Sequence, residues 1–401
     1  MLEPVVHPLP SRIVNGVGAR LRNLGFQPLR FAPGILKKRA MRMAALRDFG
    51  EPDFEEGLSV LCESVEKDAG LSLTGRLAYR ELVTNALVTR LRRIEARKRR
   101  PEAFRLALAP PLIVMGLPRS GTTLLHRLLS LAEDARSPAL WEMQQPIPGP
   151  GPDDRRKMSL REVTRFKKVA PDIDAKHHVD VDEPEEDIFL FDSSLWSFSF
   201  YVMAPVYGYL DWYLGQDPLP GYRVYREHLQ LLQADSPGKR LTLKAPAHTG
   251  FLEALLGTVP EAMIVQTHRD PVRITSSINS LMYTLQSYLT ESLDVRRAAA
   301  ANTEMFVQLV AQNMAARSRI PDGRILDVSY KDLAADPVST VKRIYDHFGL
   351  RCNASFEARM RKWMAERPQH KFGKHEYAAE DFGMSDAGIA ERFKEYIERF
   401  L

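Results

Sequence analysis

Cysteine is scarce in this chain: its 401 residues include two, Cys62 and Cys352. Two cysteines cannot build the disulfide framework of a small secreted domain or a cysteine zinc site. The first residues, MLEPVVHPLPSRIVNG, also lack the basic start and apolar run of a secretory signal. These absences predict a protein of the reducing cytoplasm.

Long hydrophobic runs are also missing. The longest uncharged stretch, Ser193–Leu210, contains Pro205, Gly208 and four serines, whereas a spanning helix needs about 20 predominantly apolar residues. We expect a buried helical hairpin or the wall of an apolar pocket there. A second segment, Leu29–Leu46, mixes basic and apolar residues. It favours an amphipathic helix packed on its own domain, and it leaves peripheral contact with an anionic membrane open.

The excess of positive charge is small: 56 Lys and Arg stand against 51 Asp and Glu, a net charge of +5. Most of it lies in one run, Arg90–Arg100, where seven basic residues accompany the single acid Glu95. A nucleic-acid-binding protein would spread or repeat its basic surface, so we expect no nucleic-acid partner. With 44% hydrophobic residues, a disordered chain is excluded as well.

The order of apolar patterns predicts an α/β fold. Residues 1–105 read as a helical extension, because Phe54–Ala69 and Leu77–Arg97 have apolar residues at three- and four-residue spacing. Residues 106–401 read as one α/β domain: a P-loop-type parallel sheet flanked by helices, with a helical and aromatic insertion at 141–239 that we expect to cover the functional edge of the sheet. The predicted strands, each followed by a helix, are PLIVMG (111–116), RLTLKAP (240–246), AMIVQTHRDP (262–271) and RILDVSY (324–330).

The turn after the first of these strands has the glycine spacing of a phosphate-binding loop. It runs from Gly116 to Thr123 as GLPRSGTT, so that backbone N–H groups and a helix N-terminus can face an anion. The nucleoside triphosphate motif requires Gly-Lys-Ser/Thr, but Thr122 stands at the lysine position and the nearby basic residue is Arg119. Hydrolysis of ATP or GTP is therefore a poor interpretation.

Three segments in register resemble the sulfotransferases that use 3'-phosphoadenosine-5'-phosphosulfate (PAPS), and the whole chain looks like their large bacterial-type branch. Pro118–Thr123 resembles the 5'-phosphosulfate loop of that family, His268–Pro271 with Ser277 resembles its 3'-phosphate site, and Ser329–Leu333 resembles its Tyr-x-Asp-Leu segment. The resemblance implies that PAPS is held by Arg119, Ser120, Gly121, Thr122, Thr123, Arg269, Ser277 and Tyr330.

The same resemblance implies transfer of the sulfuryl group from PAPS to a hydroxyl, less readily to an amine, giving PAP and a sulfate ester. No metal is required, because the sulfuryl group carries less negative charge than a phosphoryl group. We expect Arg119 to stabilise the leaving phosphate electrostatically and Lys244 to bridge donor and acceptor. Two basic residues near the C-terminus, Lys371 and Lys374, resemble a late basic loop that touches the nucleotide in relatives.

The general base stays open at this point. His248 is favoured because histidine titrates near neutrality, although it lies two residues later than in the Lys-x-His pattern of compact family members. Glu142 is the alternative, since other branches use a carboxylate after the first helix. Within the insertion, His177, Glu185 and Glu186 are further candidates.

The acceptor is indicated only by aromatic density. The segment Ile188–Leu214 contains ten aromatic residues, which either form core or line a pocket for a small-molecule or lipid-like alcohol. Two rival functions remain: a P-loop kinase acting on a small molecule, and a non-catalytic anion- or membrane-binding protein that uses the basic residues at 30–42 and 90–100. The sequence does not indicate the oligomeric state.

Overall fold

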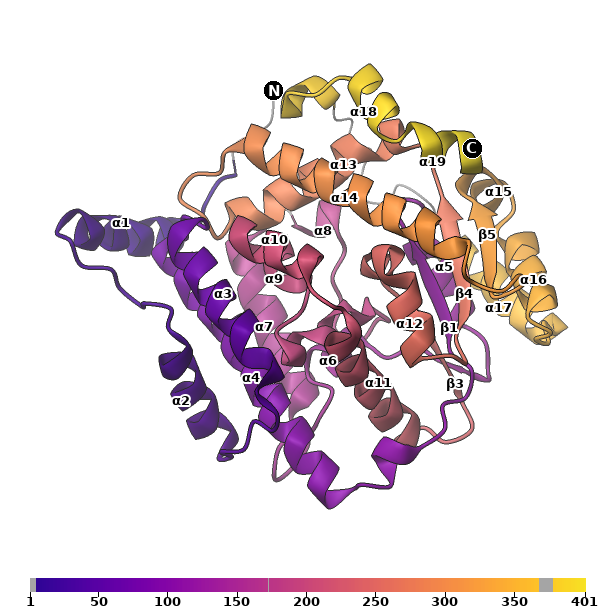
Figure 1. Cartoon of the computed structure of the whole chain (residues 1–401), viewed down its shortest axis with the longest axis horizontal. Helices are drawn as coiled ribbons and strands as arrows, with labels where there is room; N and C mark the ends of the chain where they lie inside the picture. The colour runs from indigo at the N-terminus through magenta and orange to yellow at the C-terminus, as the bar shows by residue number, and fades with distance from the viewer. Residues whose placement is uncertain (1–4, 172, 368–377) are drawn as a thin grey trace.

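The computed structural model describes residues 5–171, 173–367 and 378–401 (Figure 1). Its centre is a five-stranded sheet with the order β2-β3-β1-β4-β5, in which every neighbouring pair is parallel. The strands are β1 (Leu112–Gly116), β2 (Ala135–Arg136), β3 (Arg240–Lys244), β4 (Met263–His268) and β5 (Ile325–Ser329). The predicted α/β class with a parallel sheet is confirmed.

Side chains of β1 alternate between two cores, because successive residues of a strand point to opposite faces. Leu112 and Val114 belong to a core shared with α5, α16 and α17, whereas Ile113 and Met115 belong to the larger core on the opposite face. Every residue of β1 is buried, as expected for a parallel strand covered on both sides. The helices after the strands are α5 (Thr122–Leu129), η4 (Pro246–Phe251), α12 (Leu252–Thr258), α13 (Pro271–Ser287), α14 (Val295–Arg317), α15 (Tyr330–Ala335), α16 (Pro337–His347) and α17 (Ala354–Glu366).

The elements of the N-terminal part are all helices, and they pack along one flank of the molecule (Figure 1). Its elements are α1 (Leu9–Asn23), α2 (Pro33–Ala44), η1 (Pro52–Phe54), α3 (Glu55–Lys67), α4 (Leu73–Arg99) and η2 (Ala103–Arg105). The predicted helices correspond to α3 and α4. One hydrophobic core continues from Phe31 in this part, through Ile113 of the sheet, to Tyr396 near the C-terminus.

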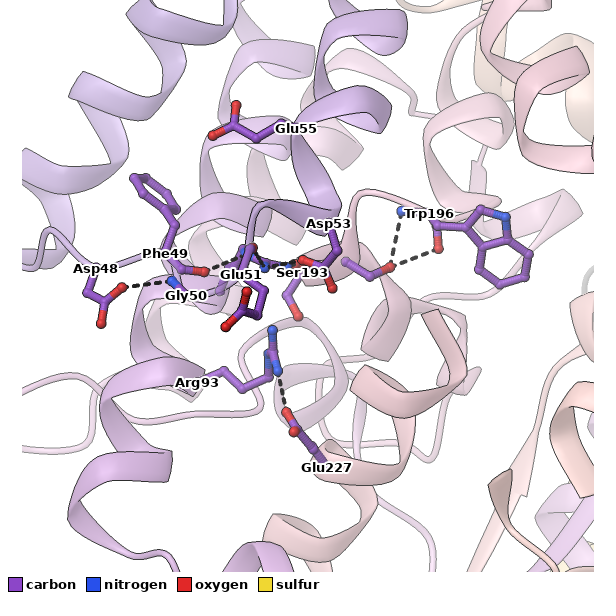
Figure 2. A network of polar contacts seen from close by, with 12 residues as sticks. Asp48, Phe49, Gly50, Glu51, Asp53, Glu55, Arg93, Ser193, Trp196 and Glu227 are labelled. Atoms are coloured by element: carbon purple, nitrogen blue, oxygen red, sulfur yellow. Dashed lines mark hydrogen bonds and ion pairs between the residues drawn. The ribbon is translucent and has the colours of Figure 1, made fainter. Parts of the chain in front are cut away.

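The basic run of α4 is paired with acids from several parts of the chain. Arg93 and Arg97 both contact Glu227, and Lys98 contacts Asp48. Figure 2 shows Arg93 against Glu227, close to the turn that carries Asp53. Further partners are Asp53 for Arg90, Glu95 for Arg99 and Asp235 for Arg100. Six of the seven cations therefore have a carboxylate partner.

The insertion between β2 and β3 is mainly helical. It comprises α6 (Leu140–Gln144), α7 (Arg155–Val169), α8 (Ile173–Lys176), η3 (Asp187–Ser194), α9 (Ser199–Met203), α10 (Tyr207–Gly215) and α11 (Leu219–Ala234). The uncharged stretch 193–210 falls on η3, α9 and α10, and most of its residues are buried. Within the described residues, we find no helix with the length and apolar character needed to cross a membrane.

The C-terminal segment returns to the sheet. After η5 (Ala379–Phe382), α18 (Asp386–Arg392) leads into α19 (Lys394–Phe400), which lies near α14 and the end of β5 (Figure 1). Phe400 stacks on His268, the last residue of β4, with ring centroids 4.1 Å apart. Lys371 and Lys374 lie outside the described residues.

Candidate active site

The phosphate-type loop joins β1 to α5 and depends on two glycines with positive φ. Gly116 has φ of 129° and Gly121 has φ of 92°. A Cβ on Gly116 would lie 2.4 Å from the carbonyl oxygen of Thr267, and one on Gly121 would lie 2.8 Å from Leu333. Close contacts to β4 and α15 therefore require glycine at both ends of the loop.

Arg119 lies between these glycines with φ of 68°, a left-handed conformation that is uncommon for a residue with a Cβ. Next to it, Ser120 is fully buried, and its hydroxyl donates to the carbonyl of Leu117 at 2.5 Å. The side chain of Arg119 is exposed, whereas Thr122 at the start of α5 is buried. Strained backbone that the surroundings hold in place is typical of ligand-binding loops. The Arg119 side chain thus lies at the surface, beside the backbone of the loop.

Arg269 and Tyr330 meet at this loop because the strands are parallel and end at one edge of the sheet. His268 of β4 pairs with Ser329 of β5, so that the next residues, Arg269 and Tyr330, emerge together. The Arg269 guanidinium stacks on the Tyr330 ring at 3.9 Å from its centroid and donates to the carbonyl of Arg119 at 2.8 Å. Three segments that the sequence analysis singled out separately are in contact.

A chain of hydrogen bonds from α19, β4 and β5 holds the backbone of Arg269. The Tyr396 hydroxyl of α19 bonds the Arg269 backbone and lies 2.9 Å from Nδ1 of His268. Nε2 of His268 lies 2.7 Å from Asp327, which also pairs with Arg317. Burial lowers the pKa of His268, so its neutral form accepts from Tyr396 and donates to Asp327. The sequence analysis missed Tyr396, which lies 128 residues from His268.

Lys244, the last residue of β3, and His248 of the following η4 lie beside the start of the loop. Lys244 pairs in register with Val114 of β1, and the Gly116 N–H donates to the Thr249 hydroxyl at 3.2 Å. The side chains of Lys244 and His248 are buried. Since β3 and β1 are adjacent and parallel, this arrangement follows directly from the fold.

Three consecutive acids of the insertion face Lys244 and His248. The Lys244 ammonium lies 2.6 Å from Glu186 and 3.7 Å from Glu185. His248 has Nε2 3.2 Å from Asp187 and Nδ1 2.9 Å from the Tyr222 hydroxyl. We call these five residues the Lys244–His248 cluster: Lys244, His248, Glu185, Glu186 and Asp187. Burial opposes ionisation of Asp187, but His248 and the Tyr225 hydroxyl outweigh it and lower the pKa of that carboxyl.

Glu142 is joined to this cluster through the backbone. Ala139 forms an isolated antiparallel bridge with Pro184, directly before the three acids. One Glu142 oxygen accepts from Arg136 at 2.6 Å, and the other accepts from the Ala139 N–H at 3.0 Å. The Glu142 side chain is 17% exposed and that of Glu186 is 26% exposed, whereas His248 is fully buried. His177, the remaining candidate, lies 3.9 Å from Glu185.

The aromatic residues of the insertion pack on one another beside His248. Phe191 stacks on Tyr225 at 4.7 Å, and Trp196 stacks on Tyr213 at 4.5 Å. A cavity lined by Ile188, Phe191, Trp196, Phe198, Tyr213, Tyr222, Ala247 and His248 offers about 10 Å³ to the centre of a water molecule. That volume holds roughly one water, so these side chains form core in this conformation.

Two further residues that the sequence analysis predicted for the site lie on helices. Thr123 is exposed at the start of α5, and Ser277 is half-buried two turns into α13.

A glycine-bounded loop at the carboxyl edge of a parallel sheet, next to an arginine and a tyrosine from adjacent strands, is typical of group-transfer enzymes of the P-loop type. Residues 110–354 match the model of the sulfotransferase family. This range is well over half of the chain, and the chain belongs to that family. The recognition made from the three sequence segments is confirmed.

Relatives come from mycobacteria. The omega-hydroxy-beta-dihydromenaquinone-9 sulfotransferase Stf3 of Mycobacterium bovis is 25% identical over 309 residues, which are 73% of this chain and 75% of the relative. The crystal structure of sulfotransferase STF1 from Mycobacterium tuberculosis has 31% identity and a TM-score of 0.77, covering 91% of this chain and 99% of that one. Sulfotransferase STF9 from Mycobacterium avium has 28% identity and a TM-score of 0.84, covering 92% and 97%. This kinship favours sulfuryl transfer over the kinase and non-catalytic alternatives.

Proposed function

We propose that this enzyme transfers the sulfuryl group of PAPS to the hydroxyl of a lipid-like alcohol, releasing PAP and a sulfate ester. The observation that carries the proposal is the contact of Arg269 with both the Arg119 carbonyl and the Tyr330 ring. This contact puts a fixed cation next to the phosphate-type loop, so that two phosphate groups of one nucleotide fit the same edge. The menaquinone-derived acceptor in the name of the Stf3 relative supports a lipid-like acceptor.

The donor set of the site fits PAPS. The resemblance assigns the 5'-phosphosulfate to the N-terminus of α5 with Ser120 and Thr123, and the 3'-phosphate to Arg269 with Ser277. PAPS supplies a sulfuryl group on a phosphate oxygen that becomes the leaving group. Arg119 stabilises the charge that develops on that oxygen, and a base of the chain takes the proton of the acceptor hydroxyl as its oxygen bonds to sulfur. Isothermal calorimetry with PAP tests the proposal, and absence of binding to folded protein would refute it.

We expect Arg269→Ala and Tyr396→Phe to weaken binding of PAP selectively. Loss of the guanidinium removes charge-assisted hydrogen bonds and lowers affinity by about 10- to 100-fold. Tyr396 is a positioning residue, so Tyr396→Phe should lower affinity less, by about fivefold, for one lost hydrogen bond. Calorimetry with PAP and with adenosine 5'-phosphate measures both effects. Because adenosine 5'-phosphate lacks the 3'-phosphate, its affinity should stay constant, and an equal loss for both nucleotides contradicts the assignment.

For the general base, the structure favours Glu142 over His248, because His248 is fully buried with both ring nitrogens engaged. We expect Glu142→Gln to lower kcat by about 100-fold or more while PAP affinity stays unchanged. Because the substitution also weakens the ion pair with Arg136, the unfolding midpoint should fall slightly, by less than in His248→Gln. His248→Gln should lower kcat together with the unfolding midpoint, since it breaks a buried pair. If Glu142→Gln retains turnover and His248→Gln loses it at an unchanged midpoint, the histidine is the base. Glu186→Gln, tested in parallel, covers the remaining carboxylate.

A further inference from the structure

The first helices have a one-sided charge. Residues 5–47 contain no acid and nine basic residues: Arg12, Arg20, Arg22, Arg30, Lys37, Lys38, Arg39, Arg42 and Arg47. Eight of these residues lie on α1, α2 and the segment between them, and Arg47 follows α2. These elements form the left border of the molecule in Figure 1. Only contacts with other parts of the chain can neutralise this charge.

Three of the nine cations are neutralised in this way. Arg22 pairs with Glu291, Lys37 with Glu55 and Arg39 with Glu81. The other six are exposed, and within the described part of the chain they form no ion pair: Arg12, Arg20, Arg30, Lys38, Arg42 and Arg47. The denser run on α4 is different, because six of its seven cations face a carboxylate. The positive surface is therefore on the first two helices.

Apolar side chains are exposed on the same elements. Five of them expose 60% or more of their surface: Val6, Leu9, Ile13, Leu24 and Phe26. On α1, Leu9, Ile13 and Val17 recur every fourth residue and form one stripe. Ile35 and Met43 on α2 are exposed as well. An uncovered apolar group of this kind marks a binding surface.

The orientation of α1 is set by its opposite face. Asn15 accepts from the backbone N–H of Thr74 at 2.9 Å. Gly18 fits so closely against α4 that an added Cβ would lie 2.6 Å from that of Leu73. The apolar stripe therefore faces away from the protein. On α2, Leu36, Ala40 and Ala44 face the core, while Lys38 and Arg42 point outward.

We propose that α1, α2 and the segment between them, residues 5–47, form a docking surface for an anionic lipid bilayer. Cations attract the acidic headgroups, and the exposed apolar side chains enter the boundary between headgroups and acyl chains. A second copy of this chain fits the surface less well, because its six unpaired cations would face the same six cations and repel them. Docking gives access to a membrane-embedded acceptor if the proposed lipid substrate is right, but the surface itself does not depend on the nucleotide chemistry.

The experiment is co-sedimentation of the full chain, without nucleotide, with vesicles of phosphatidylcholine or of an equimolar mixture with phosphatidylglycerol. Binding is expected only to the anionic vesicles and should fall as salt rises. Each cation near an acidic bilayer contributes about fivefold to partitioning, so Lys38→Ala/Arg42→Ala should weaken binding by about 30-fold. Ile13→Ser/Val17→Ser should weaken it by about tenfold or more. The matched control, Lys98→Ala/Arg99→Ala, removes two paired cations of α4 and should bind as the parent does.

Equal binding to both vesicle types, no binding to either, or equal losses in the control and the α2 variant would each overturn the proposal. Sedimentation velocity tests the rival occupant: a dimer that Ile13→Ser/Val17→Ser converts to monomer, with no vesicle binding, makes the surface a contact between copies and overturns it too. Unfolding midpoints and PAP calorimetry show that each variant is folded. If PAP fails to bind while anionic vesicles do bind, the proposed function is wrong and the docking surface stands.

Discussion

Replacing Arg119 by Ala is expected to lower kcat by about 100- to 1000-fold, the loss typical when one group that stabilises transition-state charge is removed. Binding of PAP should change by less than about tenfold, because the backbone of the phosphate-type loop and Arg269 remain. The exposed guanidinium of Arg119 makes no contribution to the core. Single-turnover measurements of sulfuryl transfer, with PAP affinity measured by calorimetry, give both numbers.

The backbone of Arg119 requires a second variant as control. Its φ of 68° costs a residue with a Cβ roughly 1–2 kcal/mol, so alanine and glycine differ in strain but equally lack the charge. Arg119→Gly and Arg119→Ala should therefore lose the same amount of turnover, and Arg119→Lys should recover part of it. If Arg119→Gly stays within threefold of the parent, the guanidinium does not stabilise the leaving group.

The sheet could be predicted because its signals are local. The wholly apolar run of β1, ended by Gly116, is a buried parallel strand on sequence alone, and the later strands repeat that pattern. The edge strand β2 was missed because its two residues, Ala135 and Arg136, have no apolar run. The family resemblance placed the loop and Arg269 on one nucleotide, and the adjacent, parallel β1 and β4 bring both to one edge of the sheet.

Contacts across long stretches of sequence could not be predicted. Glu185 and Glu186 were candidates for the base only as members of the acidic insertion, and Asp187 was not singled out, yet Glu185 and Asp187 are buried against Lys244 and His248. The pairing of Glu186 with Lys244 joins residues 58 positions apart. Only the tertiary fold, which brings η3 to the end of β3, creates this cluster. The burial of His248 depends on the same tertiary contacts, so the sequence did not indicate it. Our proposal of Glu142 as the base depends on that burial.

Net charge along the sequence was also a poor guide to the surface. The run Arg90–Arg100 has the highest local charge, yet its partners come from Asp48, Asp53, Glu227 and Asp235. The more dilute charge of residues 5–47 stays largely unpaired, because few carboxylates reach it. Of the two basic segments that the sequence offered for membrane contact, 30–42 and 90–100, only the first therefore keeps most of its charge unpaired within the described residues.

Arg90 and Arg93 are the two buried members of that run, and Arg90 bonds the turn before α3. Its guanidinium is 1% exposed and donates to the carbonyls of Phe49 at 2.8 Å and Glu51 at 2.5 Å. It also contacts Asp53 and stacks on the Phe54 ring at 4.2 Å. Burial, with a smaller effect from Arg93, lowers its pKa to about 10, so the group remains charged at neutral pH. One side chain thus ties α4 to the turn that precedes α3.

We expect Arg90→Met to lower the free energy of unfolding by about 3–5 kcal/mol, the usual loss when one partner of a buried ion pair is removed. Methionine fills much of the space, but it leaves buried carbonyls without donors, each of which costs about 1–3 kcal/mol. Urea unfolding followed by tryptophan fluorescence measures the change. Arg99→Met is the matched control, since that side chain is 70% exposed and pairs only with Glu95 one turn away, and its midpoint should stay near that of the parent. Equal midpoints for the two variants would show that the buried guanidinium contributes no more to stability than an exposed one.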